Sequence, residues 1–209
     1  MFSLNWSVIV YVVFIDFLAI MSPGPDFFMV LKNSLTKSHK AGIYTTLGIS
    51  LGCFILFLLG VLGVGALIAQ NKILFTILKF AGALYLIYLA IKSLINKSEV
   101  SEPQLVYDEN SKASVWEYFK IGLVCNLTNP KAMMFIITLA AYITEKGNPY
   151  TDGIVISIIT CINTLIWFSL VSIVFGSIKV RKVFYRYQRV INIVFAIVLF
   201  YMASKIIFL

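Results

Sequence analysis

Two short stretches of this sequence place proline and charge inside segments that are otherwise apolar. The first is SPGPDFFMVLKNSL at 22–35, and the second, 105 residues further on, is NLTNPKAMMF at 126–135. In each, a proline is followed directly by a charged residue, as Pro25–Asp26 and as Pro130–Lys131. Proline removes a backbone donor, so it leaves carbonyl groups without helical partners, which a membrane tolerates only against protein or a wet cavity. The two breaks are therefore the candidate working site of a transporter.

Each break also predicts the start of a new helix inside the membrane. Ser22 followed by Pro23, and Asn129 followed by Pro130, are favourable pairs of a helix cap and a first helical residue. A helix start presents free N–H groups and the positive end of the helix dipole, which suit an anion such as a substrate carboxylate. A single proline kink usually only shapes packing, but two kinks at matching positions, each beside a charge, favour a functional site.

Three charged residues, Asp16, Asp26 and Lys131, fall within apolar segments, where insertion costs about 2.5 to 3.5 kcal/mol each. Counting about 1.5 Å per residue from Trp6 puts Asp16 near the midplane and Asp26 closer to the cytoplasm. Asp16 by depth and Asp26 by motif are both candidates for the proton carrier. For Asp16 the alternative is a structural bond to a neighbouring helix.

Lys131 occupies the first turn of its predicted helix, where the dipole disfavours a cation. A local rule broken in this way predicts a compensating partner, and we expect that partner to be Asp26, the equivalent residue of the first break. Asn126 and Asn129 lie about one turn apart, so their amides are expected to reach one ligand. Asn163 is a candidate for lining the same cavity, although a lone intramembrane Asn more often joins two helices.

The composition defines the class of protein around these residues. Of 209 residues 60% are hydrophobic, against about 45 to 50% in soluble domains. The net charge of +8 comes from basic residues between apolar segments, as membrane topology requires, so nucleic-acid binding is not expected. Cys53, Cys125 and Cys161 have no paired spacing and predict neither a disulfide nor a metal site. The expected surroundings are a lipid bilayer, no cofactor is expected, and a homo-oligomer is left open.

Six segments are long enough to span about 30 Å of hydrocarbon, which predicts an all-α polytopic membrane protein forming one transmembrane domain over 1–209. We place them at about 6–34 (interrupted at 22–26), 43–69, 73–92, 116–143 (interrupted at 126–131), 152–177 and 188–208. Residues 93–115 are too polar to bury a core and predict a cytoplasmic loop between repeat one, about 1–92, and repeat two, about 116–209.

The two halves are predicted to be inverted repeats. Three spans per half is an odd number, so halves that resemble one another must lie in the membrane with opposite orientation. Interrupted spans at matching positions of inverted halves are typical of the binding site of a secondary transporter. Features that recur at the offset of 105 are Pro25 with Pro130, Gly42 with Gly147, Gly48 with Gly153, and Asp26 with Lys131.

The motifs PGPD at 23–26, NLTNPKA at 126–132 and GALYLIYLAIKSL at 82–94 together resemble the lysine-exporter, or LysE/RhtB, family of bacterial amino-acid exporters. The resemblance covers nearly the whole chain. It implies a bacterial plasma-membrane protein that exports amino acids or close derivatives in exchange for protons. The motif residues that carry over as substrate-binding or gating candidates are Pro23, Gly24, Pro25, Asp26, Asn126, Asn129, Pro130 and Lys131.

Three other classes of protein fit less well. A thiol-disulfide electron carrier needs a cysteine in each half, but the position equivalent to Cys125 is Ile20. A metal-cation exporter of the same superfamily, which is the alternative function, would need several carboxylates or His in the spans, and only Asp16 and Asp26 are available. A membrane enzyme would need a nucleophile or a metal constellation, which the spans lack.

The basic residues predict the orientation of the chain, because cytoplasmic connections are enriched in Lys and Arg. Twelve of the 17 follow the first, third and fifth spans, which places these connections in the cytoplasm and both termini outside. They are Lys32, Lys37, Lys40, Lys92, Lys97, Lys112, Lys120, Lys179, Arg181, Lys182, Arg186 and Arg189.

Single cysteines at Ser101 and Asn148, in a variant without the three native cysteines, test this orientation. We expect an impermeant thiol reagent to label position 148 in intact cells and position 101 only after the membrane is opened. Labelling of position 101 alone in intact cells would show that the orientation is the reverse.

Overall fold

The computed structural model describes residues 4–70, 72–95, 114–175 and 177–208, and the regular structure in these ranges is entirely helical, which confirms the all-α class. The predicted loop at 93–115 falls largely on residues 96–113, which lie outside the described residues. The helices are α1 (Trp6–Met21), α2 (Pro25–Thr36), α3 (His39–Gln70), α4 (Lys72–Ile95), α5 (Val115–Leu127), α6 (Pro130–Lys146), α7 (Thr151–Val174) and α8 (Ile178–Phe208).

Both predicted breaks are present. The axis bends by 53° between α1 and α2 and by 57° between α5 and α6. Asn129 caps α6 as expected, with Pro130 as the first helical residue. The predicted cap of the first break was wrong, because α2 starts at Pro25 with Gly24 as its cap, whereas Ser22 ends α1. The physical reason is Pro25, since a residue before proline is held extended and Gly24 cannot continue a helix begun at Pro23.

The length and composition of the helices are those of a polytopic membrane protein. Helices α3, α7 and α8 each contain a stretch long and apolar enough to cross a membrane, and the two bent pairs bring the total to as many as five among the described residues. The predicted sixth span corresponds to α4, whose described apolar stretch, Phe80–Ile95, is shorter, so the count of six remains a prediction. Large apolar side chains on the outside, such as Val10, Leu59, Leu84 and Ile197, are suited to lipid.

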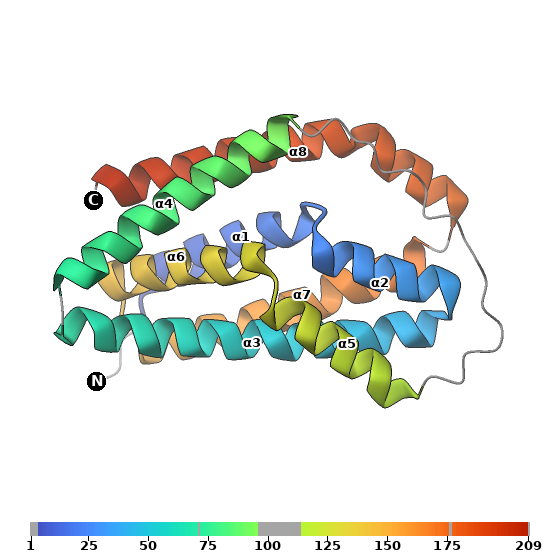
Figure 1. Ribbon diagram of the computed structural model, residues 1–209, viewed down its shortest axis with the longest axis horizontal. Helices are drawn as coiled ribbons and strands as arrows, with labels where there is room; N and C mark the ends of the chain where they lie inside the picture. The colour runs from blue at the N-terminus through green and yellow to red at the C-terminus, as the bar shows by residue number, and fades with distance from the viewer. Residues whose placement is uncertain (1–3, 71, 96–113, 176, 209) are drawn as a thin grey trace.

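The helices are arranged around the two broken spans (Figure 1). Helices α4 and α8 pack together along one side, and α3 and α7 pack together along the other. Between them lie α1 and α6 in one half of the molecule, while α2 and α5 lie in the other half. Helices α3 and α7 run antiparallel, as do α4 and α8. Each helix therefore runs opposite to its counterpart 105 or so residues later, as the inverted arrangement requires.

Helix α8 begins earlier than expected. We predicted the last span at 188–208, but the helix already starts at Ile178. Residues 178–187 contain no proline or glycine that would end a helix, so the helix continues past the apolar stretch, which begins near Arg186. The predicted basic connection is thus in large part a helical extension of the last span.

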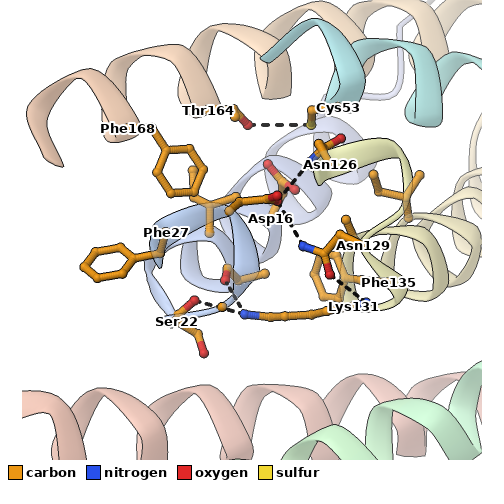
Figure 2. Close-up of a pocket in the computed structure, with 16 residues that line it drawn as sticks. Asp16, Ser22, Phe27, Cys53, Asn126, Asn129, Lys131, Phe135, Thr164 and Phe168 are labelled. Atoms are coloured by element: carbon orange, nitrogen blue, oxygen red, sulfur yellow. Dashed lines mark hydrogen bonds between the residues drawn. The ribbon is translucent and has the colours of Figure 1, made fainter. Parts of the chain in front are cut away.

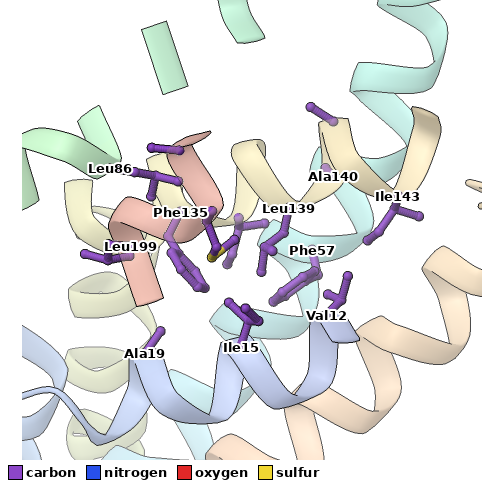
Figure 3. Packing of buried hydrophobic residues seen from close by; sticks show 14 of the residues in the cluster. Val12, Ile15, Ala19, Phe57, Leu86, Phe135, Leu139, Ala140, Ile143 and Leu199 are labelled. Carbon is purple, nitrogen blue, oxygen red and sulfur yellow. The ribbon is translucent and has the colours of Figure 1, made fainter. Parts of the chain in front are cut away.

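The hydrophobic core lies in the half of the molecule that holds α1 and α6 (Figure 3). Each of α1, α3, α4, α6 and α8 contributes large buried side chains to one cluster. Among them are Val12, Ile15, Phe57, Leu86, Leu139, Ile143 and Leu199. This packing closes the space between the broken spans on that side. A second cluster, which includes Phe27, Leu31, Ile49 and Phe168, joins α2, α3 and α7 in the other half.

Helices α3 and α5 cross closely because each has a glycine at the contact. A Cβ on Gly48 would meet the backbone carbonyl of Phe119, and a Cβ on Gly122 would meet the backbone carbonyl of Thr45. Close approach of this kind is typical of small residues in membrane helices. The crossing fixes α5, and with it the second break, against α3.

Gly48→Ala and Gly122→Ala should each destabilise the protein, because the clash is with backbone and cannot be relieved by a rotamer change. We expect a cost of about 1 to 3 kcal/mol, typical of overpacking, seen as a lower thermal midpoint in detergent. The matched control is Gly63→Ala in the same helix, where a Cβ meets nothing within 4 Å. Equal midpoints for all three variants would show that the α3–α5 crossing tolerates separation.

Candidate functional site

The carboxylate of Asp26, in the first turn of α2, is held by side chains from the second break. Asn126 Nδ2 donates to Asp26 Oδ2 at 2.9 Å, and Asn129 Nδ2 donates to the same oxygen at 3.1 Å. The Cys125 thiol donates to Asp26 Oδ1 at 3.4 Å. The two amides therefore do converge on one acceptor, as the sequence predicted, but that acceptor is a carboxylate of the protein rather than a ligand (Figure 2).

Lys131 reaches from α6 back to the end of α1. Its Nζ donates to the carbonyl of Ser22 at 2.9 Å and to that of Ala19 at 3.4 Å. It also lies 4.7 Å from the centroid of the Phe195 ring of α8. The charge thus sits at the negative end of the α1 dipole, where it binds the Ser22 carbonyl and adds a second donor to the Ala19 carbonyl, which already accepts from the N–H of Ser22.

The expected ion pair between Asp26 and Lys131 is not formed in the described structure. Instead, each residue forms hydrogen bonds with the opposite break. Asp26 accepts from Asn126 and Asn129, and Lys131 donates to carbonyl groups at the end of α1. The first-turn position of Lys131 has a simple reason: its long side chain carries the charge away from the start of α6, while its backbone N–H binds Asn129 Oδ1 at 3.0 Å.

An inner cavity of about 60 Å³ lies between the two breaks, large enough for several water molecules. One part of its wall is aromatic, formed by Phe27, Phe135 and Phe168 (Figure 2). The polar part includes Asp16, Ser22, Cys53, Asn126, Asn129, Lys131 and Thr164. Acidic, basic, amide and aromatic groups thus face one enclosed space.

Two acceptors in this cavity have no hydrogen-bond partner among the described residues. Asp16 is 3% exposed, and its Oδ2 is unpaired. Asn126 gives its Nδ2 to Asp26, but its buried Oδ1 is unpaired as well. A buried acceptor without a donor is costly, which is the reason nearly all such groups are paired in proteins. Both oxygens are themselves buried beside the cavity, and Asn126 Oδ1 lies against α3, where a Cβ on Gly52 would meet it at 2.8 Å. A ligand with N–H donors in the cavity could satisfy them once the two side chains turn toward it.

An outer cavity of about 710 Å³ lies on the other side of the breaks, against α4 and α8. Pro23, Pro25 and Pro130 line this outer cavity and not the inner one. The wall between the two cavities consists of the residues that line both, which are Ser22, Gly24, Asn129 and Lys131.

One sequence candidate lies elsewhere. Asn163 is half-buried on α7 and lines neither cavity, whereas its neighbour Thr164 lines the inner one and donates to Cys53 Sγ at 3.6 Å. One step along a helix rotates a side chain by about 100°, so a periodicity too weak to fix the face of α7 can miss by one residue. Sequence reasoning also missed Cys53, Cys125 and the three aromatic residues, which look like ordinary apolar positions.

The described residues contain no group of three or more His, Cys, Asp or Glu arranged to hold a metal ion. The cation-export alternative therefore gains no support from the described geometry.

Two broken spans that share one polar cavity, within a helical bundle with a lipid-suited surface, define a membrane transporter. More particularly, the chain belongs to the family of LysE type translocators, whose model matches residues 17–208. Members of this family are transporters, so the protein is not an enzyme.

The relatives are bacterial membrane and efflux proteins. The uncharacterized membrane protein YrhP of Bacillus subtilis is 34% identical over 71% of this chain and 74% of its own. The uncharacterized membrane protein YahN of Escherichia coli is 27% identical over 90% of this chain and 83% of its own. The leucine efflux protein of Salmonella typhimurium is 32% identical over 70% of this chain and 66% of its own. No solved structure matches the chain.

Replacing Lys131 by Met should loosen the junction of α1 with α6, because the Ser22 carbonyl at the end of α1 loses its donor, while the Ala19 carbonyl keeps only the N–H of Ser22. A hydrogen bond to a charged group contributes about 1.5 to 3 kcal/mol, so the thermal midpoint in detergent should fall by several degrees. Lys131→Arg keeps the charge and donors and should retain most of the stability. A Met variant as stable as the wild type would show that Lys131 is not what holds the end of α1.

Proposed function

We propose that this protein exports amino acids from the bacterial cytoplasm across the plasma membrane, in exchange for protons. Membership of the LysE type translocator family supports transport, and the similarity to leucine efflux proteins supports an amino acid as the substrate. The observation that carries the proposal is the pair of unpartnered acceptors, Asp16 Oδ2 and Asn126 Oδ1, in the cavity between the breaks.

The inner cavity matches the chemistry of an amino-acid zwitterion. The unpartnered oxygens of Asp16 and Asn126 suit its ammonium group, which has three N–H donors. Lys131 suits its carboxylate. The ammonium of Lys131 now donates to carbonyl groups at the end of α1, and a substrate carboxylate can replace them as the acceptor. The aromatic wall suits an apolar side chain. We therefore propose neutral, apolar amino acids such as leucine as the substrates.

Of the two carboxylates, Asp16 is the better proton carrier. The oxygens of Asp26 already accept from three donors that join the two breaks, so a proton there would disturb the structure. Asp16 Oδ2 has no such partner. A proton and a substrate ammonium compete for the same oxygen, which is the requirement for exchange: a proton arriving from outside releases the amino acid, and a new amino acid displaces the proton.

Export would proceed by alternating access. The described core closes the inner cavity on the side of α1 and α6, whereas the outer cavity opens toward the end where α4 finishes and α8 begins. The basic residues predict that this end is cytoplasmic. Movement of one half against the other at the breaks would then open the cavity to the outside.

Everted membrane vesicles test the function directly, because export then appears as uptake. We expect uptake of labelled leucine to be faster with the protein than without it, and faster still when the vesicle interior is acidic. A panel of charged, hydroxyl-bearing and apolar amino acids identifies the substrate class. Absence of any protein-dependent uptake across the panel would refute amino-acid export.

Asp16→Asn should separate coupling from folding. The side chain keeps its size but cannot be charged, so we expect normal amounts of folded protein, a loss of about tenfold or more in uptake, and residual transport that ignores the pH gradient. The control is Asp152→Asn. That buried carboxylate accepts from the backbone N–H groups of Asn5 and Asn148 at the start of α7, so its loss should lower stability and leave coupling intact. If uptake by the Asp16→Asn variant keeps a normal dependence on the pH gradient, the proton carrier is Asp26 instead.

A further inference from the structure

The outer cavity has the size and composition of a binding site in its own right. Its volume of about 710 Å³ is within the range of small-molecule pockets. It is separated from the inner cavity only by the shared wall that contains Lys131. It therefore adjoins the breaks directly, at Pro23, Pro25 and Pro130.

One side of this cavity presents an unsatisfied acceptor. Gln188 of α8 is only 4% exposed, and its Oε1 has no partner among the described residues. The cavity wall around it is held in place, because Ser93 Oγ of α4 donates to the carbonyl of Asn192, one turn further along α8, at 3.1 Å. The Oε1 atom itself is buried beside the cavity, so a rotation of the amide would bring it to face the cavity, where an oxygen without a donor is suited to an ammonium group.

The neighbouring part of the same wall, on α4, supplies the complementary groups. Tyr85, Tyr88 and Lys92 follow one another at helical spacing, so they share one face of α4, and all three line the cavity. Lys92 Nζ lies 5.6 Å from the centroid of the Tyr88 ring, which leaves its N–H donors available to an anion. Aromatic surface and a positive charge thus lie on the same side of the cavity as the lone acceptor, across the contact of α4 with α8.

We propose that the outer cavity is a first binding subsite for the amino acid, with Gln188 as a specificity-determining residue. Gln188 Oε1 accepts from the substrate ammonium, Lys92 attracts the carboxylate, and the two tyrosines contact the side chain. The amino acid then passes the Lys131 wall to reach Asp16. The subsite rests on the proposed function and deepens it, because it assigns recognition to one face of the membrane.

Kinetics from the two faces test the subsite. In everted vesicles Gln188→Met, which keeps the length and loses the amide, should raise the KM for leucine about tenfold and leave the maximal rate within about twofold. In right-side-out vesicles, where substrate enters from the opposite face, the same variant should have the wild-type KM. Gln188→Glu keeps an acceptor and should keep a KM close to that of the wild type. The matched control is Tyr187→Phe, at the adjacent exposed position of α8.

Each outcome bears on the proposal. The subsite is overturned if the KM of Gln188→Met is unchanged, or if it rises equally from both faces of the membrane. Export by the wild type in the same experiment keeps the proposed function in place. No export by the wild type removes the function and the subsite with it. Should Gln188→Met yield little folded protein, Lys92→Gln on the exposed part of α4 takes its place: it should raise KM from the everted face alone, and failure to do so overturns the subsite.

Discussion

The structure depends on how the polar ends of two broken helices are satisfied where lipid can supply no hydrogen bond. Neither break is self-sufficient. The carboxylate that starts α2 is held by amides from the second break, and the Ser22 carbonyl at the end of α1 is held by the ammonium of Lys131. Because unsatisfied polar groups cost several kcal/mol each in hydrocarbon, this exchange couples the two halves.

Because of this exchange, the intramembrane charged residues have different roles. Asp26 and Lys131 are engaged with the opposite break, so they hold the junction together. Asp16, which lines the inner cavity and is 3% exposed, keeps a buried oxygen unpaired. A transporter needs both kinds of group: engaged charges that define a state, and a free one that exchanges ligands. In our proposal the substrate connects them, since its carboxylate competes for Lys131 while its ammonium competes with a proton for Asp16.

The two ends of the molecule are unequal although the sequence predicts that the halves are repeats. Buried aliphatic and aromatic side chains close the end that holds α1 and α6, whereas the outer cavity occupies the other end, between the breaks and the paired α4 and α8. An inverted repeat can exchange these two arrangements by movement of one half against the other, because each half already contains the helices needed for either. The described arrangement is the one open at the end where α4 finishes.

The sequence by itself determined the class, the helices and the two breaks. Apolar length, proline position and charge act over a few residues, so they can be read without knowing what packs against what, and the family membership confirms the resemblance that the motifs carry. Only the tertiary structure decided the partners. Pairing Asp26 with Lys131 was the natural guess from symmetry, but a side chain as long as Lys131 reaches the carbonyls of α1, and two amides take the carboxylate. Likewise, the face of α7 that meets the cavity is the one that buries its small polar side chains, among them Thr160 and Thr164, so Thr164 rather than Asn163 lines the cavity. Contacts between residues about a hundred positions apart depend on packing geometry, which cannot be predicted from the order of residues along the chain.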